Sequence, residues 1–247
     1  MPLTRPPMTQ VPGHPNNRYL TRNGYRPEAV CVHTMAGTLA ACDSWFANPA
    51  SKAGTHFGVG RIGEIHQYHP VATAPFANGV IEAGYTAALI DQNPGANPNW
   101  LTVSIEHDDL GNGSPPTAAQ FEASAQLSAW LCAVVLPEMG SLVPVDRAHV
   151  LSHSDISPLS RPRCNGWGEA RMAAYIARIN AIIAGAQPQP EPTPVPTRER
   201  EYLDALTVQA AALDQWSTYV RDLAAYTGTV ADALTIQRDN IKTIIGG

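Results

Sequence analysis

The chain has 247 residues, of which 44% are hydrophobic and 15% are charged, against roughly 25% charged residues in typical soluble domains. Its formal net charge is −5. These values argue against a highly charged disordered protein and against a basic nucleic-acid-binding protein, and no apolar run reaches the roughly 18 residues that span a bilayer.

The N-terminal segment, residues 1–27, is predicted to be an extension that packs on the domain after it. Its first residues, from Met1 to Pro7, contain no apolar stretch of the kind that forms a signal peptide. We therefore expect the protein to be made in the cytoplasm, with no export by the usual route.

Five β-prone segments between residues 28 and 186 are predicted to form strands. Residues 29–33 are a short apolar run of the kind seen in buried strands, and residues 101–106 alternate apolar and polar side chains. Residues 56–60 and 64–68 flank a turn that contains Gly63, which predicts a hairpin. Residues 148–151 complete the set.

Two helices are expected in the same domain. Thr117 is a suitable N-cap for a helix that runs through Val135 and stops at Pro137. A second helix, ending near Gly185, would bury one apolar face made of Met172, Ile176, Ile179 and Ile183. Strands mixed with helices in this way predict an α/β fold with a central mixed β-sheet flanked by helices.

The last part of the chain differs from the rest in pattern. Residues 187–198 carry proline at alternate positions, which favours a stiff extended linker. Between Tyr202 and Ile244, positions spaced alternately by four and three residues are mostly apolar, which is typical of coiled coils. We predict that residues 199–247 form an all-α tail, a coiled coil or helical bundle that makes the protein a homo-oligomer. A cell-wall-binding module is the alternative.

Two histidines and one cysteine lie where loops should follow strands. His33 and His153 each end a predicted strand, and Cys164 follows in a polar loop. His, His and Cys can hold Zn²⁺ and leave the fourth tetrahedral position for water. On spacing alone, loop histidines exposed to solvent and an inert cysteine explain the same residues. The other cysteines, Cys31, Cys42 and Cys132, are expected to be small core residues.

Four stretches of the chain resemble, in order, the type-2 N-acetylmuramoyl-L-alanine amidases, the zinc amidase and peptidoglycan-recognition family common in phage endolysins. They are Val30–Gly37, Ala53–Gln67, Thr102–His107 and Leu151–Cys164, and the resemblance covers roughly residues 28–186. It implies an amidase-like fold and a Zn²⁺ site made of His33, His153 and Cys164.

The resemblance also implies the reaction and its base. The scissile bond would be the amide that joins N-acetylmuramic acid to L-alanine of the peptidoglycan stem peptide. Glu106 matches the family's glutamate, and a carboxylate beside the metal can take the water proton and pass it to the leaving nitrogen. From spacing alone, Glu106 would be an ordinary carboxylate at a strand end.

Candidates for substrate contact are Thr55, His56, Asn78 and Arg163. Thr55 stands where some members have tyrosine, His56 fits a structural role equally well, and Asn78 fits a simple turn. Some members carry a lysine where this chain has Pro162, so Arg161 or Arg163 is a candidate to stabilise the oxyanion. Trp45 and Trp167 are interpreted as packing residues, not as sugar platforms.

Together these observations predict a zinc-dependent peptidoglycan amidase with a helical tail, of the phage endolysin type. By that resemblance it would remain in the host cytoplasm until a holin releases it to the cell wall. The alternative is a non-catalytic peptidoglycan-binding protein of the same fold. No nucleic acid and no membrane span are expected.

Overall fold

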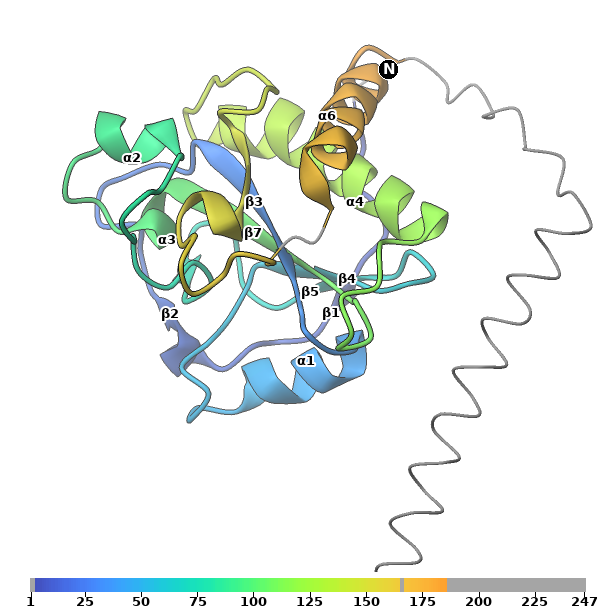
Figure 1. The fold of residues 1–247 in the computed structure, drawn as a ribbon, viewed down its shortest axis with the longest axis horizontal. Helices are drawn as coiled ribbons and strands as arrows, with labels where there is room; N and C mark the ends of the chain where they lie inside the picture. Colours follow the sequence, from blue (N-terminus) through green and yellow to red (C-terminus); the bar gives the residue numbers. More distant parts are fainter. Residues whose placement is uncertain (1–2, 165–166, 186–247) are drawn as a thin grey trace, which may run out of the picture. The chain divides into compact units, whose positions relative to one another are not determined.

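The computed structural model describes residues 3–164 and 167–185, which form an α/β fold around one mixed sheet (Figure 1). Six strands lie in the order β1-β5-β4-β7-β3-β8, and β2 pairs with β6 separately. Their bounds are β1 Thr9–Gln10, β2 Arg18–Tyr19, β3 Ala29–Thr34, β4 Phe57–Val59, β5 Ile65–Gln67, β6 Ala74–Pro75, β7 Thr102–His107 and β8 Val150–Ser152. The prediction of a mixed sheet is therefore confirmed.

The predicted strands are all present, and their pairing defines two halves of the sheet. β4 and β5 form the expected antiparallel hairpin, and β1 adds to β5 in parallel. β4, β7, β3 and β8 run parallel to one another. Parallel strands end at the same edge of a sheet, so the carboxyl ends of these four strands meet there.

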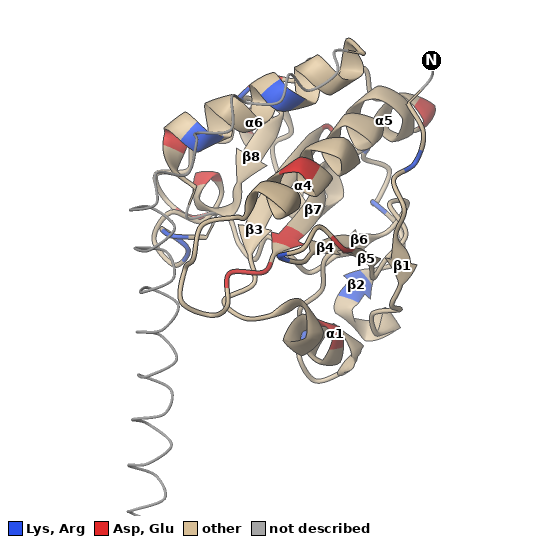
Figure 2. Cartoon of the chain, turned by 90° about the vertical axis from the view of Figure 1, so that its right-hand side faces the viewer, with Lys and Arg blue, Asp and Glu red and all other residues tan. Residues whose placement is uncertain are grey.

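Helices cover the sheet on both faces, and alternate residues of each strand contact one helix layer or the other. The helices are α1 Leu39–Ala47, α2 Ala88–Gln92, α3 Pro98–Leu101, α4 Ala118–Trp130, α5 Leu136–Glu138 and α6 Gly168–Ile183. In β3, Val30 and Val32 pack with residues of α4 and α6, whereas Ala29 and Cys31 pack with residues of α2 and α3. Figure 2 shows charged residues on α4 and α6, which lie outside the sheet.

The helix predicted after Thr117 begins as expected and ends later. The Thr117 hydroxyl accepts a hydrogen bond from Gln120 N, which confirms the N-cap. Pro137 does not stop the helix, because α4 continues through a π-helical turn, η2 Leu131–Val135, into α5. In a regular α-helix the proline ring meets the carbonyl four residues earlier, and the wider π turn directly before it relaxes that contact.

The second predicted helix corresponds to α6, and its buried face is close to the expected one. Met172 and Ile179 are fully buried, together with Tyr175, while Ile183 is 37% exposed. A buried hydroxyl needs a hydrogen-bond partner. Ser124 and Ser128 of α4 supply partners for Tyr175, since their Oγ atoms lie 2.6 and 2.7 Å from its hydroxyl.

Residues 3–27 are part of this fold through two short strands and one buried arginine. The Arg22 side chain is 4% exposed and donates hydrogen bonds to the carbonyls of Val71, Trp100 and Thr102. Burial lowers the pKa of its guanidinium to about 9. Carbonyl oxygens thus replace the water that Arg22 loses on folding.

The predicted linker and tail, residues 187–198 and 199–247, lie outside the described residues. Within the described part of the chain, no helix is both long enough and apolar enough to cross a bilayer.

Replacement of Leu127 by alanine should destabilise the domain by about 2–5 kcal/mol, because Leu127 is fully buried between α4 and the sheet and its removal leaves a cavity. Leu142→Ala is the matched control, since Leu142 is 87% exposed and its loss should change stability by less than about 0.5 kcal/mol. Urea unfolding followed by circular dichroism measures both. Equal values for the two variants would contradict this description of the core.

Candidate metal centre

The register of three parallel strands brings His33, Glu106 and His153 together. His33 of β3 lies directly opposite Glu106 of β7, and Val32 lies opposite Ser152, the last residue of β8. Successive side chains on a strand point to opposite faces. His33 therefore shares the face of Ala29 and Cys31. His153 directly follows Ser152, so it lies beside His33 just after the end of β8.

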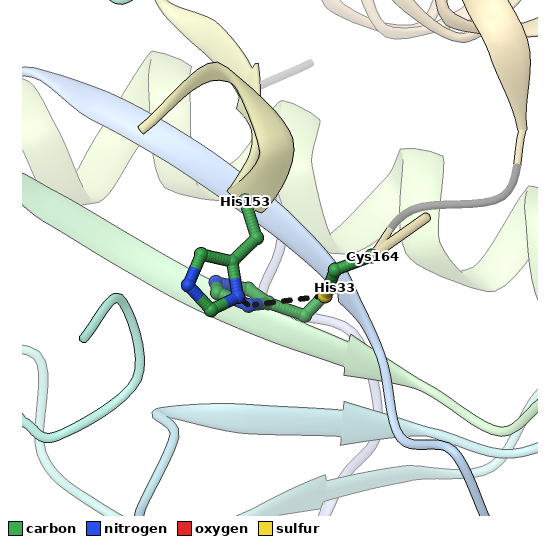
Figure 3. A group of neighbouring side chains, drawn as sticks. All are labelled: His33, His153 and Cys164. Atoms are coloured by element: carbon green, nitrogen blue, oxygen red, sulfur yellow. Dashed lines mark hydrogen bonds between the residues drawn. The ribbon is translucent and has the colours of Figure 1, made fainter. Parts of the chain in front are cut away.

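Cys164 completes a group of three side chains that point toward one another (Figure 3). His153 opens the short helix η3 His153–Asp155, and Cys164 lies in the loop that follows. The Nδ1 atoms of His33 and His153 are 3.0 Å apart, and the Sγ of Cys164 is 3.8 Å from the Nδ1 of His33. The three ligand atoms all lie within 4.8 Å of one another.

These distances fit a tetrahedral zinc ion. With Zn–N of about 2.0 Å and Zn–S of about 2.3 Å, two ligand nitrogens of such a site are about 3.3 Å apart and a nitrogen and a sulfur about 3.5 Å apart. The observed 3.0 and 3.8 Å differ from those edges by a few tenths of an ångström. The three sequence-predicted ligands therefore lie close enough together to share one zinc ion, and three protein ligands leave the fourth tetrahedral position for water.

The protonation states of the three side chains also suit a metal. Burial lowers the pKa of His153 to about 4 and that of His33 well below its usual value, so both imidazoles are neutral and able to bind. Burial, with the neighbouring charge of Glu106, raises the pKa of the Cys164 thiol to about 12. A metal ion must displace that proton, which links zinc binding to proton release.

Glu106 stands beside the ligand group without belonging to it. Its Oε1 is 3.9 Å from the Nδ1 of His33, and its buried Oε2 has no hydrogen-bond partner within the described residues. Burial raises the pKa of this carboxyl to about 8; Asp109 adds to the shift and Arg161 opposes it. A carboxyl with these properties can exchange a proton near neutral pH.

The group opens onto a cavity of about 920 Å³. Glu106, His153 and Cys164 line it together with Lys52, Asp109, Arg161 and Arg163 from irregular segments. Trp45 lines it too and is 54% exposed, so the interpretation of Trp45 as a packing residue is wrong. Trp167 is buried, as predicted, against His107 and Tyr175.

Of the four predicted substrate contacts, only Arg163 lines this cavity. Thr55 is fully buried and donates to the carbonyls of Phe57 and Ser104, which ties β4 to β7. His56 is 1% exposed and hydrogen-bonds with Arg22, Ser104 and the Thr73 carbonyl. Their side chains hold the sheet together and are not available to a substrate, which corrects the prediction for Thr55 and favours the structural alternative for His56.

Asn78 is also fully buried, but it lies against the ligands. Its side-chain nitrogen donates to Thr102 Oγ1 at 2.6 Å. Burial dominates the pKa of His33 and His153, and Asn78 opposes the downward shift at both. Asn78 is thus buried and does not line the cavity, so the structure does not present it as a substrate contact.

Three residues that line the cavity were not identified as site residues from the sequence: Lys52, Asp109 and Trp45. Only Asp109 carried a usable signal, because it follows Glu106 by three residues, directly after the predicted strand. Lys52 and Trp45 enter the cavity from α1 and the loop after it, whose position depends on tertiary packing.

Comparison with known proteins agrees with the geometry. A family model for N-acetylmuramoyl-L-alanine amidase matches residues 23–167. N-acetylmuramoyl-L-alanine amidase A of Achromobacter lyticus is 32% identical over 114 residues, 42% of this chain and 51% of that protein, so the chain spans about half the length of this curated relative.

Solved structures show the same fold at low identity. A mutant of PlyL is 13% identical with a TM-score of 0.51, and the match covers 71% of this chain and 99% of that one. The PlyG catalytic domain is 15% identical with a TM-score of 0.50, covering 76% of this chain and 100% of that one.

Replacement of Cys164 by serine should remove most bound zinc, since a hydroxyl is a far poorer ligand than a thiolate. Metal analysis of the protein dialysed against low zinc measures the loss. Cys132→Ser is the matched control, because Cys132 packs in the core with Leu127 and Leu131 and does not belong to the ligand group. Full zinc occupancy in the Cys164 variant would show that the third ligand is a different residue.

Proposed function

The chain belongs to the N-acetylmuramoyl-L-alanine amidase family, and from that membership we propose that it hydrolyses peptidoglycan at the amide between N-acetylmuramic acid and L-alanine. Zinc is the proposed cofactor. The observation that carries the proposal is the meeting of His33, His153 and Cys164 at one cavity with the buried carboxyl of Glu106, whose Oε2 has no hydrogen-bond partner within the described residues.

The metal ligands and Glu106 have separate roles in the proposed reaction. Zn²⁺ held by the two imidazoles and the thiolate would polarise the scissile carbonyl and make water more acidic. Glu106 is the proposed general base, because its Oε1 lies close to the ligand group and no other side chain occupies its second oxygen within the described residues. After taking the water proton, Glu106 would give it to the nitrogen of L-alanine as that amine leaves.

Three cations are the proposed contacts to the rest of the substrate. Lys52, Arg161 and Arg163 line the cavity and form no ion pair within the described part of the chain. Stem peptides carry carboxylates, which such side chains attract. Arg161 lines the same cavity as Glu106 and lowers the pKa of its carboxyl, so it is the proposed group to stabilise an oxyanion.

The finer biological role is also part of this proposal. The chain would serve as a phage endolysin, remain in the host cytoplasm, and reach the wall after holin-dependent release. The four motif stretches and the Pro-rich linker before a heptad pattern support an endolysin with a separate tail. Several catalytic domains joined through residues 199–247 would act on one wall surface with higher avidity.

Purified cell walls treated with the chain should release stem peptides that begin with a free N-terminal alanine, identified by mass spectrometry. Glu106→Gln should keep its zinc and lose about 10²–10⁴-fold in rate, because an amide cannot accept the water proton. Metal content and turnover are measured on the same preparation. Glu64→Gln, at the exposed hairpin turn, is the control and should keep both.

Other outcomes separate the alternatives. Loss of zinc in the Glu106 variant would make Glu106 a ligand or a support of one. Near-normal turnover with zinc retained would exclude Glu106 as the base. Wall binding without any hydrolysis by the unaltered chain would favour the non-catalytic peptidoglycan-binding protein.

The tail should make the full chain an oligomer. Light scattering after size exclusion should give a multiple of the 26.4 kDa chain mass for the full chain, and a monomer for a chain that ends at Ala186. Monomeric masses for both would reject oligomerisation and favour the wall-binding alternative for residues 199–247.

A further inference from the structure

Five hydrogen bonds converge on the guanidinium of Arg147, in the loop before β8. Its Nη1 and Nη2 donate to the two carboxylate oxygens of Asp155, both at 2.8 Å. Its Nη2 and Nε donate to the two carboxylate oxygens of Glu169 at 2.9 and 3.1 Å, and Nη1 also donates to the Val150 carbonyl at 3.2 Å. A guanidinium has five N–H donors. All five of them are used here.

The first carboxylate fixes the turn that presents His153. Asp155 is the last residue of η3, and its Oδ2 accepts a hydrogen bond from Ser152 N at 2.7 Å, which closes the turn over His153. The same carboxylate therefore receives hydrogen bonds both from Arg147 and from the backbone N–H of Ser152, the residue directly before His153.

The second carboxylate lies on the far side of the Cys164 loop. Glu169 is in the first turn of α6, and Cys164 comes from the segment between Asp155 and Glu169. One guanidinium thus holds both ends of the segment that supplies Cys164. It also contacts Val150, the first residue of β8, the strand that leads to His153. Closing a loop at its ends reduces the number of conformations that the loop can adopt.

We propose that Arg147 is a positioning residue of the metal centre, which holds the His153 turn and both ends of the Cys164 segment so that the two ligands face His33. This inference rests on the zinc site of the proposed function. It goes beyond that function because Arg147 belongs to neither the ligand group nor the cavity lining.

The fork shape of arginine is needed for this role. Two carboxylates and a carbonyl are reached at once only by the planar guanidinium, whereas a lysine ammonium offers three donors from a single atom. The ion pair with Glu169 contributes little to global stability, because the Arg147 side chain is 36% exposed and that of Glu169 is 77% exposed. The effect of that pair should therefore appear in metal binding more than in unfolding.

The chain contains a matched control for the loss of a two-pronged arginine contact. Arg178 of α6 donates through Nε and Nη2 to the two carboxylate oxygens of Glu122 of α4, at 2.8 and 2.7 Å. This pair has the same chemistry and is more buried than the Arg147 pair with Glu169. It joins two helices and contacts no segment that carries a ligand.

The test compares Arg147→Lys with Arg178→Lys in the full chain. Zinc affinity is measured by competition with a chromophoric chelator, and the visible and near-ultraviolet spectrum is recorded after Co²⁺ replaces zinc. Arg147→Lys should weaken zinc binding about 10–100-fold, as removal of groups that orient metal ligands typically does. Its thiolate-to-cobalt charge-transfer band should shift or weaken, while Arg178→Lys should keep the affinity and the spectrum of the unaltered chain.

Glu169→Gln is a second variant, which changes only an exposed side chain. It should weaken zinc binding by a smaller factor than Arg147→Lys, because the hold on η3 remains. Unchanged zinc affinity and cobalt spectra in Arg147→Lys and Glu169→Gln would overturn the role of Arg147. So would a loss of zinc affinity in the control Arg178→Lys as large as that in Arg147→Lys. If the unaltered chain failed to bind zinc, the metal centre itself would be rejected, and hydrolysis assays would then decide separately on the proposed function.

Discussion

The parallel pairing of β3 with β7 and β8 is the constraint on which the site depends. This register sets His33 opposite Glu106. It also sets Val32 opposite Ser152, so that the next residues of the two segments, His33 and His153, lie side by side. A shift of one residue in either pairing would turn a ligand or the carboxylate toward α4 and α6. The apolar residues before each of these side chains hold the register, because every second one is buried against the helices.

Burial then gives these side chains their chemistry. The same layers that fix the strands remove water from His33, His153 and Cys164, so the imidazoles lose their protons and the thiol keeps its own. Buried polar atoms without partners are costly to a folded chain. A cation bound by His33, His153 and Cys164 would replace the water that these ligand atoms lose on folding, so metal binding should stabilise the fold.

The sequence predicted the parts of the fold that follow local patterns. The apolar run of β3, the hairpin of β4 and β5 and the N-cap at Thr117 are visible in composition and spacing alone. Pro137 misled because a π turn, which no local rule anticipates, carries the helix past it. The sequence predicts a substrate contact for Thr55 and leaves the role of His56 open, because a motif gives a residue's place in the chain and not the direction of its side chain. Trp45 is the opposite case, because it was interpreted as a packing residue and yet lines the cavity. Nothing in the local sequence indicated which way its side chain would point.

The three ligands were recognised through their motifs, but the means by which they are held could not be read in the same way. His33 and the Glu106 carboxylate belong to strands, whose hydrogen bonds fix them. His153 and Cys164 lie beyond the end of β8, where no ladder holds the chain, and a metal site tolerates only small errors in ligand position. The fully used guanidinium of Arg147 supplies the missing restraint from outside the motifs. Contacts of this kind join residues that are distant in sequence, so only the folded chain reveals them.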